Sequence, residues 1–165
     1  MQRKAIIMNK VHYSSKSNEW CTPKNVFLNL DEEFDFILDA AASKENTLCE
    51  QFFSKEDDAL TKDWSEYGSV WCNPPYGRQV SKFIKKGFEE SKKGATVVML
   101  VPARVDTKWW HSYCAKAEVR FIKGRLKFAR TGDTEDDPVP AAAPFPSAIV
   151  VFRQMQAPTT KYVTI

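Results

Sequence analysis

The sequence predicts an α/β fold whose central sheet is mostly parallel and carries an antiparallel end strand, with about six or seven strands in all. Residues 96–101 form a continuous β-branched apolar run, which is typical of a strand buried on both faces of a parallel sheet. Between this run and an earlier one at residues 69–72, apolar residues recur at helical spacing, which indicates a crossover helix. Strand, helix and strand in this order form the repeating unit of α/β folds.

Length and composition indicate one globular domain, since the chain has 165 residues, of which 43% are hydrophobic and 13% aromatic. No apolar run approaches the length of a membrane-spanning helix, and residues 1–17 lack the apolar core of a secretion signal. The four cysteines are scattered without a CxxC pair, and His12 and His111 have no neighbours at metal-ligand spacing. We therefore expect reduced thiols, no metal site and a cytoplasmic location.

Charge is distributed unevenly along the chain, although the net charge is only +3. Residues 31–66 hold 12 acids and 3 bases, whereas residues 78–130 hold 14 bases and 4 acids. A basic half of this kind suits a polyanionic partner such as DNA. For the lysines at positions 85, 86, 92 and 93, the surface of a solvated helix is the favoured explanation.

The N-terminal part of the chain predicts a flexible arm at residues 1–17, followed by a helix. Thr22 is a good N-cap, Pro23 suits the first helical position, and apolar residues follow at positions 26, 27 and 30. A helix N-terminus can hold a ligand carboxylate, so this turn either contacts a ligand or is a plain capped helix.

Two short strands are expected next, each followed by candidate ligand-binding residues. Residues 36–38 lead into Asp39 and three alanines, whose small side chains allow a ligand to approach the backbone. A second strand at residues 49–53 precedes Asp57, Asp58 and Asp63. A carboxylate after the second strand binds ribose hydroxyls in many α/β cofactor sites, which makes Asp57 and Asp58 candidates for this role, while Asp63 is a candidate to flank the adenine of such a cofactor. We rank Asp58 first, with helix-capping surface acids as the alternative.

The strand at residues 69–72 stops on Asn73-Pro74-Pro75-Tyr76-Gly77, where the two prolines cannot continue a hydrogen-bonded ladder. The Asn73 side-chain oxygen and the Pro74 carbonyl could accept the two N–H bonds of an exocyclic amine, and neither is a base. Tyr76 offers a flat ring on which an extrahelical base can stack. Ordinary turn punctuation is the competing interpretation.

The second half of the chain predicts a helix at residues 78–92, the central strand at 96–101, a helix opening near Asp106 and a last strand at 147–152. A hairpin is expected from residues 119–122 and 125–128 around Lys123-Gly124, with Arg125 and Lys127 on one face. Arg104 follows the central strand and should emerge at the same edge as Asn73. Residues 131–143 should form an acidic loop, and the tail at residues 154–165 carries no clear pattern.

Three segments in this order resemble the phage-type DNA N6-adenine methyltransferases (the phage Dam family): Glu19-Trp20-Cys21-Thr22-Pro23, Asn73-Pro74-Pro75-Tyr76-Gly77 and Pro144-Phe145-Pro146-Ser147. The resemblance covers residues 18–153, which we take as the methyltransferase domain. It implies a Rossmann-like fold, S-adenosylmethionine as the cofactor, double-stranded DNA as the partner and adenine N6 as the methyl acceptor. Catalysis is then expected from Asn73, Pro74, Pro75 and Tyr76.

The same resemblance, taken with the residue patterns above, implies two sets of binding residues. Cofactor contacts are expected from Trp20, Thr22, Pro23, Asp39, Ala40, Ala41, Asp58 and Asn73. DNA contacts are expected from Arg78, Arg104, Lys108, Arg125 and Lys127. No glycine pair follows the first strand, which departs from the usual nucleotide-binding pattern and leaves the contacts of the Asp39 loop open.

Three alternatives stay open at the level of sequence. A cytosine-N4 methyltransferase uses the same two acceptors, and a protein-glutamine methyltransferase uses them without needing the basic half. A non-catalytic DNA-binding relative would have no need of Asn73 and Tyr76 together with a cofactor loop.

Overall fold

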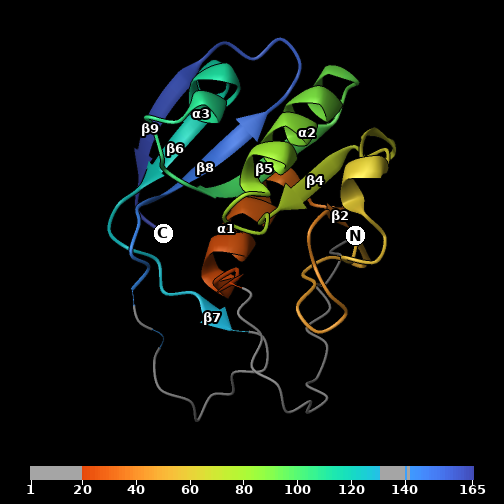
Figure 1. Ribbon diagram of the computed structural model, residues 1–165, viewed down its shortest axis with the longest axis horizontal. Helices are drawn as coiled ribbons and strands as arrows, with labels where there is room; N and C mark the ends of the chain where they lie inside the picture. The colour runs from red at the N-terminus through yellow and green to blue at the C-terminus, as the bar shows by residue number, and fades with distance from the viewer. Residues whose placement is uncertain (1–19, 131–139, 141) are drawn as a thin grey trace.

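The computed structural model describes residues 20–130, 140 and 142–165, and within them a seven-stranded sheet lies between helices on both faces (Figure 1). The strand order is β3-β2-β4-β5-β8-β6-β9. Helix α1 (Lys24–Phe34) lies on one face, and helices α2 (Val80–Lys92) and α3 (Lys108–Ser112) lie on the other. The predicted α/β fold with a mostly parallel sheet is confirmed.

The parallel half of the sheet comprises β2 (Leu38–Asp39), β3 (Gln51–Phe52), β4 (Ser69–Cys72) and β5 (Thr96–Pro102). Strand β2 pairs with β3 and β4, and β4 pairs with β5, all in parallel register. The carboxyl ends of these four strands therefore meet at one edge of the sheet, where ligands bind in open α/β folds.

The prediction of an antiparallel end strand was wrong in position. The antiparallel strand β8 (Ser147–Phe152) lies inside the sheet, between β5 and β6 (Glu118–Ile122). All six residues of β8 are buried, so the strand needs neighbours on both edges and packing on both faces. The true edge is formed by β9 (Thr159–Val163), which pairs in parallel with β6 and comes from the tail whose sequence showed no clear pattern.

The predicted hairpin is also wrong, because residues 125–128 do not return along β6. Both edges of β6 are occupied, by β8 and by β9. Instead, Lys127 forms an isolated bridge with Ala142, and β7 (Ala129–Arg130) pairs with β1 (Trp20–Cys21) in a small two-stranded sheet. The predicted alternation still holds, since Phe128 is buried while Arg125 and Lys127 are exposed.

The core has one layer on each face of the sheet. On the side of α1, Phe27, Phe36 and Trp71 pack ring against ring. On the other side, Ile84 of α2 and Trp110 of α3 pack over the inner residues of β5 and β8. Gly87 lets α2 approach this layer closely, because an added Cβ would lie 2.9 Å from the Met99 sulfur and 3.2 Å from a Val97 methyl group.

The helices begin close to the predicted places, with one correction. Pro23 is the N-cap of α1 rather than its first residue, and no side chain in the described part of the chain caps this N-terminus. Thr22, predicted as the cap, has its hydroxyl turned to Asn73 instead. Short 3-10 turns complete the chain at η1 (Ala59–Thr61), η2 (Ser65–Tyr67) and η3 (Cys114–Lys116).

The predicted arm at residues 1–17 lies outside the described residues, as does most of the predicted acidic loop at 131–143. Among the helices that the structure does describe, none is long and apolar enough to cross a membrane.

Candidate functional site

A cavity of about 590 Å³ opens at the carboxyl edge of the parallel strands. Its walls come from the segment before α1, the loops after β2, β3 and β4, and the first turn of α2. Among the predicted cofactor and catalytic residues, those that line it are Trp20, Thr22, Asp39, Ala40, Ala41, Asp58, Asn73, Pro74, Pro75 and Tyr76. Pro23 does not line it. The edge chosen from the strand pattern is therefore where the structure places a ligand-sized cavity.

Asn73 is held at the end of β4 by contacts with the segment before α1. Its Nδ2 donates to the Trp20 carbonyl at 2.9 Å and to the Thr22 hydroxyl at 3.1 Å. Its Oδ1 is buried and has no hydrogen-bond partner among the described residues. A buried amide oxygen without a partner costs free energy, so its retention at a cavity indicates an acceptor reserved for a ligand.

Tyr76 stands beside Asn73 with its ring half-buried in an aromatic group. The ring meets Phe145 and Phe128 edge to face, with centroids 5.4 Å and 6.1 Å away. Its hydroxyl points to the Leu100 carbonyl at 3.4 Å. These contacts fix the ring while it still lines the cavity, which is the requirement for a stacking platform.

Asp39 lies at the end of β2 with only 3% of its surface exposed. Its two oxygens accept weak hydrogen bonds, at 3.4 Å from the Ala41 amide and 3.3 Å from the Leu48 amide. Burial raises the pKa of Asp39 to about 7, and the two amide donors offset only part of this. A carboxylate that is costly to charge and faces a cavity is suited to a cationic ligand group.

The structure separates the three acids proposed for the ribose or adenine. Asp58 lines the cavity, whereas Asp57 accepts from the Ser54 amide and hydroxyl, both at 2.7 Å. Asp63 is bound to Ser65 and pairs with Lys93 at 3.5 Å. The hydrogen bonds from Ser65 lower the pKa of Asp63 to about 2, and those from Ser54 lower the pKa of Asp57. Only Asp58 of these three is therefore placed to meet a ligand in the cavity.

Cavity residues that the sequence analysis missed lie mainly in the loops after the predicted strands and in the first turns of α2. They are Cys21, Asn46, Leu48, Phe53, Ser54, Lys55, Ala59, Leu60, Trp71, Gln79, Lys82 and Phe83. Phe53, Leu60 and Phe83 supply apolar wall suited to a flat ring. Their loop positions pointed toward this edge, but nothing in the sequence showed which of them face inward.

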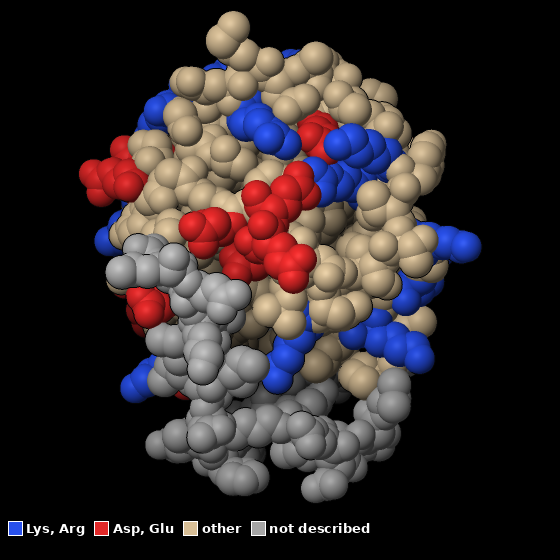
Figure 2. Space-filling view, turned by 180° about the vertical axis from the view of Figure 1, so that it is seen from behind, with Lys and Arg blue, Asp and Glu red and all other residues tan. Residues whose placement is uncertain are grey.

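All five residues predicted to contact DNA are exposed, and none lines the cavity. Arg78, Arg104 and Arg125 follow β4, β5 and β6 respectively, which end at the same edge of the sheet as the cavity, although, among the described residues of these three loops, only those after β4 line it. The face covered by α1 carries the opposite charge: Figure 2 shows acidic side chains gathered over the middle of this face. Within the described residues, no group of three or more His, Cys, Asp or Glu side chains could hold a metal ion.

Comparison with known proteins gives a consistent result. The sequence profile of a family described as DNA N-6-adenine-methyltransferase (Dam) matches residues 10–165. A protein named DNA N-6-adenine-methyltransferase from Escherichia phage T1 is 40% identical over 122 residues, which cover 68% of this chain and 51% of that protein. One of the same name from Haemophilus phage HP1 is 31% identical over 128 residues, covering 74% of this chain and 73% of that protein. The chain thus spans about half the length of the phage T1 relative.

Proposed function

Because the chain belongs to the DNA N-6-adenine-methyltransferase (Dam) family, we propose that it transfers the methyl group of S-adenosylmethionine to N6 of an adenine in DNA. The observation that carries this proposal is the Asn73 side chain, whose buried Oδ1 lacks a partner among the described residues while its Nδ2 is held by two acceptors. That arrangement leaves the amide oxygen available for a donor on the substrate.

The residues of the cavity fit the cofactor that Dam-family methyltransferases use. Asp39 suits the ammonium group, Asp58 the ribose hydroxyls, and Phe53, Leu60 and Phe83 the adenine ring. The volume of about 590 Å³ lies within the range of small-molecule sites. When bound, S-adenosylmethionine supplies an electrophilic methyl group; this chain's own residues position the acceptor.

The target amine is a poor nucleophile because its lone pair is delocalised into the adenine ring. If Asn73 Oδ1 and the Pro74 carbonyl each accept one N–H bond, the nitrogen becomes pyramidal and its lone pair is aimed into the cavity. Both acceptors are preorganised, Asn73 by its bonds to Trp20 and Thr22, and Pro74 by its ring and its burial. No general base is needed in the approach to the transition state: the leaving group would be neutral S-adenosylhomocysteine, and the methylated N6 would afterwards release one proton to water.

The target adenine must leave the helix to reach this edge, as in other enzymes that act on single bases. Tyr76 provides a ring on which the adenine can stack. Contacts with the DNA backbone come from exposed basic side chains, namely those of Arg78, Arg104, Lys108, Arg125 and Lys127. Their positive charge and their positions after the strands support this role in DNA binding.

The test is methyl transfer from labelled S-adenosylmethionine to a mixture of double-stranded DNA, RNA and protein, followed by hydrolysis of each product. We expect the label in N6-methyladenine from DNA, and its loss in the Asn73→Ala variant. Label in N4-methylcytosine or in methylglutamine would replace the proposal with one of the two related activities.

A further inference from the structure

The cavity wall formed by Asp58 and Ala59 is built from a segment with little regular structure. Asp58 has a left-handed backbone conformation, with φ of 51°, which is uncommon for a residue other than glycine. The turns η1 and η2 that follow are three residues each. A wall of this kind keeps its shape only if contacts from outside the segment fix it.

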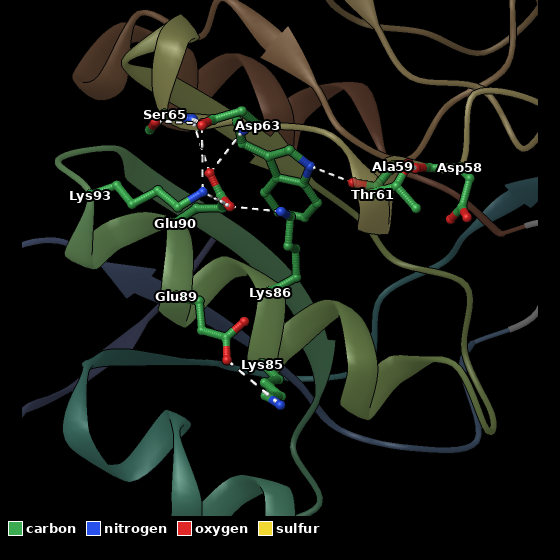
Figure 3. Close-up of polar contacts among 11 residues, drawn as sticks. Asp58, Ala59, Thr61, Asp63, Ser65, Lys85, Lys86, Glu89, Glu90 and Lys93 are labelled. Carbon is green, nitrogen blue, oxygen red and sulfur yellow. Dashed lines mark hydrogen bonds and ion pairs between the residues drawn. The ribbon is translucent and has the colours of Figure 1, made fainter.

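Such contacts come from Glu90, in the last turns of α2. Its side chain is only 1% exposed. The backbone amides that its carboxylate binds lie 25 and 26 residues earlier in the sequence. Oε2 accepts from the Trp64 amide at 2.9 Å and from the Ser65 amide at 3.1 Å. Oε1 accepts from Lys86 at 2.7 Å and Lys93 at 2.9 Å, and Figure 3 shows these two lysines converging on it.

All four donors favour the charged form of Glu90. Burial alone would raise the pKa of this carboxyl, but the hydrogen bonds from Lys86, Lys93 and the Trp64 amide hold it below its ordinary value. Glu90 is thus a charged, fully partnered side chain beneath the segment. A buried carboxylate that receives two amide donors and two ammonium groups fixes all of its partners in one geometry.

The link from Glu90 to the cavity passes through Trp64. The Trp64 backbone amide binds Glu90, while its indole Nε1 donates to the Ala59 carbonyl at 2.9 Å. The indole is completely buried and lies near Phe83, another cavity residue, with ring centroids 6.3 Å apart. Displacement of Trp64 would therefore shift Ala59 and, with it, the adjacent Asp58.

We propose that Glu90 is a positioning residue for the cofactor, which holds the Asp58–Ala59 wall in its binding geometry through Trp64 and Ser65. This inference rests on the proposed function, since it assumes that the cavity binds S-adenosylmethionine. Glu90 touches neither the cavity nor the catalytic edge at Asn73 and Tyr76. Its loss should consequently weaken cofactor binding and leave the turnover of the saturated enzyme nearly unchanged.

Four variants of the full chain test this: Glu90→Gln, Glu90→Ala, Asp58→Ala and Asp58→Ala combined with Glu90→Gln. The control is Glu89→Gln, because Glu89 neighbours Glu90 on α2 but, among the described residues, its side chain forms only an exposed pair with Lys85 at 3.6 Å. Binding of S-adenosylhomocysteine is measured by calorimetry, KM for the cofactor and kcat by DNA methylation, and folding by thermal unfolding.

We expect Glu90→Gln to raise Kd and KM for the cofactor about tenfold, with kcat within about twofold of wild type. Glu90→Ala should raise them further, because glutamine still offers an oxygen to the two amides. In the Asp58→Ala background, Glu90→Gln should add less than about twofold, since its effect runs through Asp58. Glu89→Gln should match wild type.

Fully additive effects of Asp58→Ala and Glu90→Gln on Kd, or a wild-type Kd in a folded Glu90→Gln protein, would overturn the role of Glu90. Equal losses in kcat and in affinity would do the same, since they indicate general loosening of the fold. Failure of the proposed function gives a different result: wild-type protein would bind no S-adenosylhomocysteine and methylate no DNA.

Discussion

At the scale of single residues, Asn73 has two parts with separate tasks. Its amide nitrogen is used for anchoring, by bonds to Trp20 and Thr22, and its amide oxygen is left without a partner among the described residues. Substitutions can separate these tasks, because alanine removes both and aspartate removes only the donors. The anchoring contacts were not foreseeable from the sequence, since they join residues more than 50 positions apart.

Asn73→Ala should lower kcat by about 10²–10³, the usual effect of removing one preorganised contact to a reacting group. Cofactor affinity should stay within a few-fold of wild type. The kcat of Asn73→Asp should lie between those of wild type and Asn73→Ala. Its carboxylate keeps an acceptor for the target amine but has no proton to donate to the Trp20 carbonyl. Single-turnover methylation with saturating cofactor measures this order; near-normal turnover of Asn73→Ala would contradict the assigned mechanism.

Asp39 should make stability depend on pH. Its pKa is about 7 in the folded chain and near 3.8 without burial, so between these values the folded chain binds the extra proton. The free energy of unfolding should therefore fall as pH rises from about 4 to about 7, by up to about 4 kcal/mol. Above pH 7, Asp39 is ionised in both states, and its titration should cause no further loss of stability.

The measurement is urea unfolding of wild type and Asp39→Asn without cofactor, at several pH values. Asparagine cannot ionise, so the stability of the variant relative to wild type should rise across this window. Taking the difference between the two proteins cancels the titration of all other groups. A difference that does not change with pH would show that Asp39 ionises in the folded chain as easily as in water.

At the scale of elements, those with a strong local pattern were predicted well. The β-branched run of β5, the apolar spacing of α2 and the proline stop after β4 each hold their predicted place. Pairing partners were not predictable in the same way, because an apolar run such as β8 shows that a strand is buried but not which strands flank it. The hairpin prediction failed for this reason, and β9 had no pattern at all because most of its residues are exposed.

The candidate site shows the same division. Its edge and its polar centre followed from where the strands stop, so Asn73, Asp39 and Asp58 could be named. The positioning of these residues depends on contacts across the fold, such as the bond between Trp64 and Glu90. A buried glutamate among helix lysines has the sequence pattern of a surface ion pair, and only tertiary packing distinguishes the two.

Gly87 provides a prediction for the packing of α2 on the sheet. In Gly87→Ala the new methyl group would meet the Met99 sulfur and the Val97 side chain at less than ordinary contact distance. Overpacking of this kind costs about 1–3 kcal/mol, while alanine gains about 1 kcal/mol over glycine as a helix former. We expect a net destabilisation of about 1 kcal/mol in urea unfolding.

The matched control for this variant is Lys85→Ala, an exposed position on the same helix, which should change stability by less than about 0.5 kcal/mol. A Gly87→Ala protein more stable than wild type would mean that α2 can move away from β5 without cost.

At the scale of the whole molecule, acidic side chains gather over the face that α1 covers (Figure 2), whereas the exposed Arg78, Arg104 and Arg125 follow strands that end at the cavity edge of the sheet. This division predicts how DNA affinity responds to salt. Replacing Arg104, Arg125 or Lys127 singly by alanine should weaken binding and make the slope of log K against log salt shallower by about 0.9 for each lost phosphate contact. Lys85→Ala, away from these strand ends, should keep the wild-type slope; three unchanged slopes for the strand-end variants would place the DNA on another surface.

Strand β9 has a further consequence for the behaviour of the protein in concentrated solution. It covers the outer edge of β6, stacks Tyr162 on Phe121 with ring centroids 5.7 Å apart, and brings Lys161 to the buried Glu118 at 2.9 Å. Without residues 154–165, β6 would present a row of unpaired amides and carbonyls beside an exposed aromatic ring, which is a template for aggregation. Strand β9 has an outer edge of its own, but its exposed Thr160 and Lys161 make that edge polar, and a lysine on a sheet edge disfavours pairing with a neighbouring copy of the protein.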